Sequence, residues 1–125
     1  MPARKTTPDF QPVFDELRKL IEPYAGTLKP HAKAGDYVLI GPPTPRSQGK
    51  DVWFGAVQIK KNYVSYHLMP VYAFPDLLDG LSPELKKRMQ GKSCFNFKTV
   101  DKALFKELGA LTRKGHQRYK KEGLV

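Results

Sequence analysis

The chain has 125 residues and a formal net charge of +10, and hydrophobic residues make up 40% of it. This apolar content excludes a disordered chain, and no apolar run approaches the roughly 18 residues of a membrane span. Cys94 is the only cysteine, so an internal disulfide is excluded and a cytoplasmic location is expected. The positive charge permits nucleic acid, acidic proteins or anionic ligands as partners.

We expect one domain over residues 9–122, preceded by a flexible basic arm at 1–8. No hydrophobic stretch follows the basic start, so we expect no signal peptide. Residues 10–24 carry apolar side chains at spacings of three and four, which predicts an amphipathic helix. Pro12 suits the first turn, so this helix is expected to begin near Gln11.

The middle of the chain is predicted to begin with a connection at 25–36 and a short strand at 36–41, "DYVLIG". The next segment, "PPTPRSQGK" at 42–50, is rich in proline and is expected to be a mobile loop. A longer strand follows at 51–60.

A two-residue turn at Lys61 and Asn62 would join that strand to a return strand ending near Met69. On one face, shared with Trp53, the predicted pairs are Ile59–Val64, Val57–Tyr66 and Gly55–Leu68. On the other face they are Lys60–Tyr63, Gln58–Ser65, Ala56–His67 and Phe54–Met69. A slip of one residue would mix the two sets, so the pattern favours this register.

Farther along, residues 73–81 indicate a helical turn, and 82–89 a short helix with Ser82 at its N-cap. "SCFNFK" at 93–98 alternates apolar with polar residues as a strand does, and Asp101 is expected to cap a long final helix. The apolar face of that helix is predicted to hold Leu104, Phe105, Leu108, Leu111, Thr112, Gly115 and Tyr119.

These elements predict an α+β two-layer sandwich, in which a mostly antiparallel sheet is covered on one face by the N- and C-terminal helices. From "VWFGAVQIKKNYVSYHLMPVY" through "GKSCFNFKTVDKALFKELGALTRKG" the chain resembles the YdhG-like family, a group of small bacterial domains largely of unknown function. The resemblance implies an α/β sandwich, and one branch of the family is described as frataxin-like intracellular iron chaperones. The family segment resembling "ISYGMPAF" is replaced here by "DYVLIGPPTPRSQGKDVWF".

Frataxin-like intracellular iron binding is a further alternative function that the resemblance implies. Such a role would need a dense acidic surface, whereas residues 98–122 hold eight Lys or Arg and three Asp or Glu. The three histidines fall in different predicted elements, so no metal site and no cofactor is predicted. No set of residues forms a complete acid, base and nucleophile group, and enzymatic activity is therefore expected less than binding of a ligand, a protein or nucleic acid.

The predicted function is non-catalytic binding of a small ligand or a protein partner on the face of the sheet away from the helices. The candidate ligand-binding residues are Phe54, Gln58, Ser65, His67 and Asn96. The open alternative is that residues 73–81 fold over this face and make it a second, minor core.

Nucleic-acid binding is the alternative function, through lysines beside an aromatic ring and a basic end of the final helix. The candidate residues are Lys60, Lys61, Tyr63, Arg113, Lys114 and Arg118. Cations also favour the C-terminal end of any helix, which explains the last three without a ligand.

Overall fold

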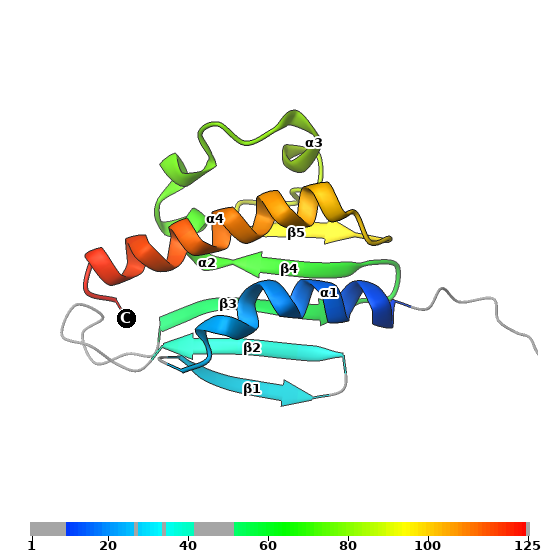
Figure 1. Cartoon of the computed structure of the whole chain (residues 1–125), viewed down its shortest axis with the longest axis horizontal. Helices are drawn as coiled ribbons and strands as arrows, with labels where there is room; N and C mark the ends of the chain where they lie inside the picture. Colours follow the sequence, from blue (N-terminus) through cyan, green and yellow to red (C-terminus); the bar gives the residue numbers. More distant parts are fainter. Residues whose placement is uncertain (1–9, 27, 34, 42–51, 125) are drawn as a thin grey trace, which may run out of the picture.

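The computed structural model describes residues 10–26, 28–33, 35–41 and 52–124. The predicted basic arm at 1–8 and the predicted loop at 42–50 lie outside the described residues. The elements in chain order are α1 (Gln11–Ile21), η1 (Glu22–Tyr24), β1 (Lys29–Lys33), β2 (Asp36–Gly41), β3 (Val52–Ile59), β4 (Val64–Leu68), α2 (Met69–Ala73), η2 (Pro75–Leu78), α3 (Pro83–Lys86), β5 (Cys94–Phe97) and α4 (Lys102–Lys121) (Figure 1).

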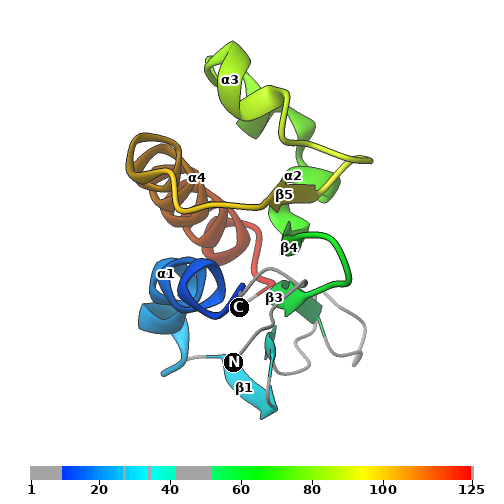
Figure 2. The ribbon, with the colours of Figure 1, turned by 90° about the vertical axis from the view of Figure 1, so that its right-hand side faces the viewer.

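The five strands form one antiparallel sheet in the order β1-β2-β3-β4-β5. Figure 2 shows α1 and α4 side by side on one face of this sheet. The α+β two-layer sandwich with terminal helices is therefore confirmed. We call the face beneath α1 and α4 the inner face and the opposite one the outer face. No helix in the described part of the chain covers the outer face (Figure 2).

The core lies between the inner face and the two helices. Tyr66, Val57 and Leu68 point into it from the sheet and are fully buried. The predicted apolar face of α4 is confirmed residue for residue, and α1 begins at Gln11 with a proline in its first turn, as expected. Burial of each large apolar side chain stabilises the fold by about 1.5–3 kcal/mol.

The predicted β3–β4 hairpin is confirmed, with Val57 opposite Tyr66 and Gly55 opposite Leu68. The backbone N–H of Lys60 donates to the Tyr63 carbonyl at 2.8 Å, which closes the predicted two-residue turn. Both predicted N-caps are also present: the side chains of Ser82 and Asp101 accept hydrogen bonds from backbone amides in α3 and α4.

Two elements were not predicted. Residues 25–36 were expected as a connection, but Lys29–Lys33 form β1 at the edge of the sheet. All five of its side chains are exposed, so it carries none of the alternation that marks a half-buried strand and is held by backbone pairing with β2. The short helix α2 was also missed, because Pro70 indicated an end to regular structure and instead occupies the helix's first turn.

The prediction that Trp53 shares the inner face was wrong. The β2–β3 register shifts so that Leu39 pairs with Gly55 while Ile40 pairs with Trp53, which leaves Phe54 as an extra residue in a β-bulge. The bulge reverses the alternation: Phe54 is fully buried, whereas Trp53 is 49% exposed.

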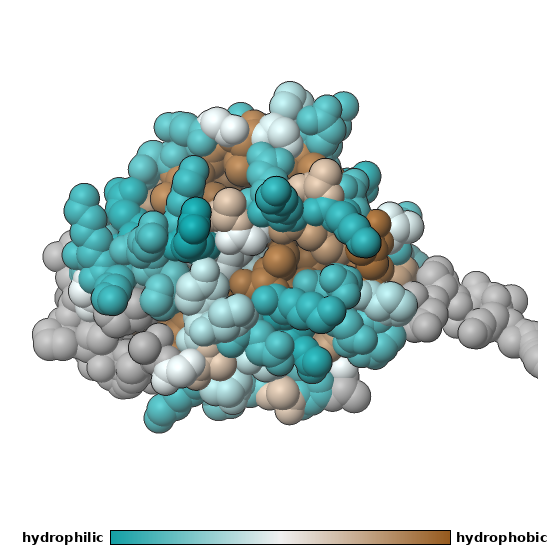
Figure 3. Space-filling view, in the orientation of Figure 1, coloured by the Kyte–Doolittle hydropathy of each residue, from teal (hydrophilic) through white to brown (hydrophobic). Residues whose placement is uncertain are grey.

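Figure 3 views the molecule from the helix side, where hydrophilic side chains dominate and hydrophobic ones show between α1 and α4. In the described part of the chain no helix combines the length and apolarity that a membrane crossing needs.

Candidate binding surface on the outer sheet face

The outer face combines a polar cluster with exposed cations and one exposed indole ring. Register and alternation place the following side chains on it: Lys29, His31, Lys33, Asp36, Val38, Ile40, Trp53, Ala56, Gln58, Ser65, His67, Cys94 and Asn96. Of the five predicted ligand-binding residues, four are therefore on this face.

The fifth, Phe54, was predicted there wrongly, because the bulge turns it inward. The centre of its ring lies 5.6 Å from the ring centre of His116 and 6.0 Å from that of Tyr119, and both of these residues are in α4. The outer face therefore lacks the phenylalanine that was predicted to form an apolar wall of the site. Trp53 is the large aromatic residue on the outer face instead.

Ser65, His67 and Asn96 are brought together around the Cys94 thiol. The thiol donates to Oδ1 of Asn96 at 3.3 Å, so the Ser65 hydroxyl, 2.8 Å from the sulfur, is left to donate to it. Nε2 of His67 lies 3.7 Å from the same sulfur. Asn96 in turn donates to the side-chain oxygen of Gln90. The cluster is thus linked internally: the Ser65 side chain is buried, and His67, Cys94 and Asn96 are partly exposed at the surface.

His67 is half-buried, and this burial lowers the pKa of its imidazole below the ordinary 6.5, with the positive charge of Lys60 acting in the same direction. The ring is therefore neutral at pH 7 and offers a hydrogen bond rather than a charge. Gln58, the remaining predicted ligand residue, donates from Nε2 to Oδ1 of Asp36 at 3.1 Å.

Charge is distributed unevenly over the fold. Five lysines lie on the outer face or beside it: Lys29, Lys33, Lys60, Lys61 and Lys98. In the described part of the chain, Asp36 is the one carboxylate residue on a strand. The others lie in helices or at their ends: Asp15, Glu16, Glu22, Asp76, Asp79, Glu84, Asp101, Glu107 and Glu122. The outer face is therefore electropositive.

The predicted nucleic-acid residues do not form one patch. Lys60, Lys61 and Tyr63 follow the end of β3, whereas the C-terminal half of α4 lies over the start of that strand (Figure 1). The Tyr119 hydroxyl, near the end of α4, donates to the Trp53 carbonyl at 3.1 Å. The turn and the basic end of α4 are thus at opposite ends of the sheet.

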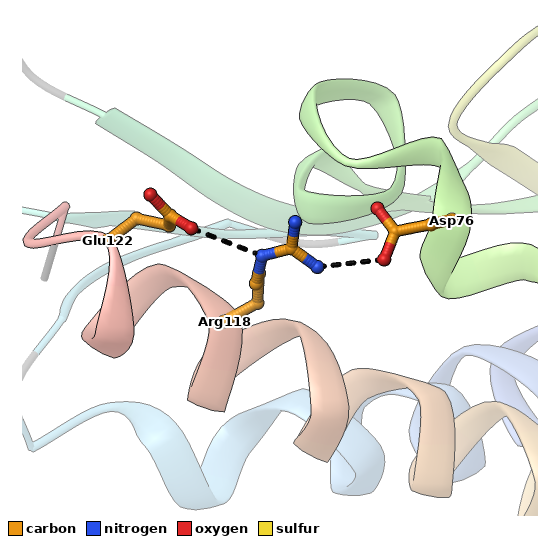
Figure 4. Close-up of polar contacts among 3 residues, drawn as sticks. All are labelled: Asp76, Arg118 and Glu122. Atoms are coloured by element: carbon orange, nitrogen blue, oxygen red, sulfur yellow. Dashed lines mark hydrogen bonds and ion pairs between the residues drawn. The ribbon is translucent and has the colours of Figure 1, made fainter.

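Arg118 is held within the fold (Figure 4). Its Nη1 donates to Oδ2 of Asp76 at 2.9 Å, and its Nε donates to Oε2 of Glu122 at 3.3 Å. Its guanidinium also lies 4.4 Å from the centre of the Phe74 ring. The hydrogen bond from Arg118 lowers the pKa of the Asp76 carboxyl. Arg118 therefore ties α4 to η2, while Arg113 and Lys114 are exposed on α4.

One feature was missed by sequence reasoning: a pocket of about 290 Å³ at the corner where the β3–β4 turn meets the outer edge of β5. It forms because residues 88–90 pair with β5, through hydrogen bonds from Asn96 to Arg88 and from Gln90 to Cys94. We call it the corner pocket, and its lining includes Tyr63, Lys87, Arg88, Gln90, Asn96 and Lys98. The basic run 86–88 was the available signal, but nothing in the sequence showed that it pairs with β5.

Within residues 10–26, 28–33, 35–41 and 52–124, no three His, Cys, Asp or Glu side chains gather closely enough to hold a metal ion. An iron-binding role consequently finds no ligand cluster in this part of the chain. Comparisons with protein-family models, with curated proteins and with solved structures find no match to this chain.

Proposed function

We propose that this chain is a non-catalytic binding module that holds single-stranded nucleic acid on its outer sheet face. The observation that carries the proposal is that five lysines lie on or beside a sheet face that no described helix covers, while Asp36 is the one carboxylate residue on its described strands. Lysines neutralise phosphates and release their counterions, which favours binding of an anionic chain.

The aromatic side chains support a single strand over a duplex. Trp53, at 49% exposure, and Tyr63 lie toward opposite ends of the outer surface of β3 and the following turn. Unpaired bases stack on such rings, whereas bases in a duplex are stacked on one another. The amides of Gln58 and Asn96 lie between the two rings and offer hydrogen bonds to base edges.

This proposal joins the predicted nucleic-acid function to the surface predicted for a ligand. A small polar ligand is the second candidate, and the linked cluster of Ser65, His67, Cys94 and Asn96 favours it. We place either activity in the cytoplasm, which the single cysteine supports. The resemblance to YdhG-like domains belongs to this proposal too, and the confirmed hairpin and final helix agree with it.

The test is binding of a fluorescent 12-nucleotide mixed-sequence strand to the full chain, measured by anisotropy at several salt concentrations. The double variant Lys29→Ala/Lys33→Ala should weaken binding and flatten the salt dependence by about 0.7 in log–log slope per lost phosphate contact. Trp53→Ala should weaken binding by about fivefold or more through loss of base stacking.

Arg113→Ala/Lys114→Ala is the matched control, because it removes the same charge from exposed positions on the helix layer. It should change affinity by less than about twofold beyond the general effect of net charge. Absence of binding at low salt would refute the proposal, and so would an equal loss in the two double variants. A response to small metabolites without oligonucleotide binding would favour the second candidate.

A further inference from the structure

The corner pocket is more strongly cationic than the rest of the outer face. Lys87, Arg88 and Lys98 line it, and no carboxylate residue does. None of the three makes an ion pair with a carboxylate in the described part of the chain. All three side chains are exposed, so their charges face solvent without a partner from these residues. Three unpaired cations around one cavity favour an anion, and the fork of an arginine suits phosphate oxygens.

The remaining walls suit the organic part of a nucleotide. Tyr63 contributes a partly buried ring, and Gln90 and Asn96 contribute side-chain amides. Asn96 uses one amide hydrogen on Gln90, and an amide nitrogen carries two. A flat ring beside amides is the combination that holds a nucleobase by stacking and by hydrogen bonds to its edge.

The volume limits the size of the ligand. At about 290 Å³ the pocket lies just below the range of about 300–1,000 Å³ for small-molecule sites. It has room for one nucleotide and not for several. Because Tyr63 is in the β3–β4 turn and Asn96 is on the outer face of β5, the pocket is continuous with the surface proposed for a strand.

We propose that the corner pocket binds one nucleoside phosphate, with the phosphate at Lys87, Arg88 and Lys98 and the base against Tyr63. The ligand is a free mononucleotide or the phosphorylated terminal nucleotide of a strand, which share this chemistry. Binding of a terminal nucleotide rests on the proposed function of the outer face, whereas binding of a free mononucleotide does not.

The experiment is calorimetric titration of the full chain with AMP, adenosine and inorganic phosphate. AMP should bind. Adenosine and inorganic phosphate should each bind at least about tenfold more weakly than AMP, because each lacks half of the contacts. Arg88→Ala should weaken AMP binding by about tenfold or more through loss of charge-assisted hydrogen bonds. Tyr63→Ala should weaken it by about fivefold or more. Lys86→Ala, two residues away and outside the pocket, makes the same charge change as Arg88→Ala and should leave AMP affinity within about twofold.

A second arm compares 12-nucleotide strands with and without a terminal phosphate. A preference for the phosphorylated strand that Arg88→Ala removes would assign the pocket to strand ends, and AMP binding alone would assign it to free nucleotides. The inference is overturned if neither AMP nor the terminal phosphate gives binding that Arg88→Ala weakens, or if inorganic phosphate binds as tightly as AMP. If the pocket inference fails but the oligonucleotides still bind through Lys29 and Lys33, the proposed function remains intact. AMP binding without any strand binding would refute the proposed function and keep the pocket.

Discussion

The two faces of the sheet are built from the same strands and differ in almost every property. The inner face meets α1 and α4 and buries Val57, Tyr66 and Phe95 completely. The outer face presents cations, amides and the Trp53 ring, and most of these side chains are partly or fully exposed. Since successive residues of a strand point to opposite faces, one stretch of sequence can specify packing and a binding surface at once.

The difference shows where stability and binding are separable. The inner face carries the apolar burial that dominates folding, so substitutions there should act on the free energy of unfolding. The outer face contributes little apolar burial, so substitutions there should act on affinity. The bulge at Trp53 and Phe54 is the place where adjacent residues exchange these roles, and it offers the sharpest test.

Phe54→Ala should have the largest effect on stability. The ring is fully buried among Tyr24, His116 and Tyr119, and its removal should lower the free energy of unfolding by about 3–5 kcal/mol. Trp53→Ala removes a larger ring from the next position, yet it should cost under about 1 kcal/mol because that ring is 49% exposed.

Urea titration monitored by far-ultraviolet circular dichroism measures both variants against the wild-type chain. The pair is matched, since each variant removes one aromatic ring from β3. A larger loss of stability in Trp53→Ala than in Phe54→Ala would contradict the bulge and return Trp53 to the inner face.

The sequence predicts the hairpin register well because Val57, Ile59, Val64 and Tyr66 alternate with polar residues and tolerate only one pairing. The bulge could not be predicted from that hairpin. The bulge depends on the pairing of β3 with β2. Leu39 and Ile40 are both apolar, so their side chains do not indicate which register β2 and β3 adopt. The alternation was therefore extended through Trp53, and the two aromatic residues were assigned to the wrong faces.

The candidate site was predictable only in part. Ser65, His67 and Asn96 followed from strand alternation and meet as that pattern implies. The corner pocket depends on Arg88 and its neighbours pairing with the edge of β5, a contact between segments with no pattern in common. Edge pairing through backbone groups leaves no signature in side-chain periodicity, which is also why β1 was missed.

Gly55→Ala should have the next largest effect on stability. This variant tests how closely α1 and the His67 backbone approach β3 at Gly55. A Cβ atom at Gly55 would lie 2.6 Å from the Cδ1 atom of Ile21 and 2.8 Å from the His67 carbonyl oxygen. The backbone oxygen cannot move aside cheaply, so we expect a loss of about 1–3 kcal/mol in the free energy of unfolding. Gly26→Ala is the control, since a Cβ atom there would meet nothing within 4 Å, and it should be neutral or slightly stabilising. Equal urea midpoints for the two variants would show that neither Ile21 nor the His67 carbonyl approaches Gly55 this closely.

Tyr66→Phe should have a smaller effect on stability than Phe54→Ala or Gly55→Ala, and its dependence on pH distinguishes it from a simple packing change. The Thr112 hydroxyl donates to the Leu108 carbonyl, so the Tyr66 hydroxyl, 2.6 Å from Thr112 Oγ1, is the donor between those two side chains. Loss of this hydrogen bond should cost about 0.5–1.5 kcal/mol at pH 7, whereas Tyr72→Phe, at a residue 55% exposed, should cost nothing measurable.

Burial raises the pKa of the Tyr66 phenol above its ordinary value of 10, so between pH 7 and 9 the group is protonated in both the folded and the unfolded chain. Above pH 10 the unfolded chain releases this proton while the folded chain keeps it, which favours unfolding of the wild type by up to about 1.4 kcal/mol per pH unit. The Tyr66→Phe variant has no phenol at this position and therefore no such proton to release. The gap in unfolding free energy between the two chains should therefore narrow as the pH rises from 9 to 11, and a gap that stays constant would mean that Tyr66 is not buried as a protonated phenol.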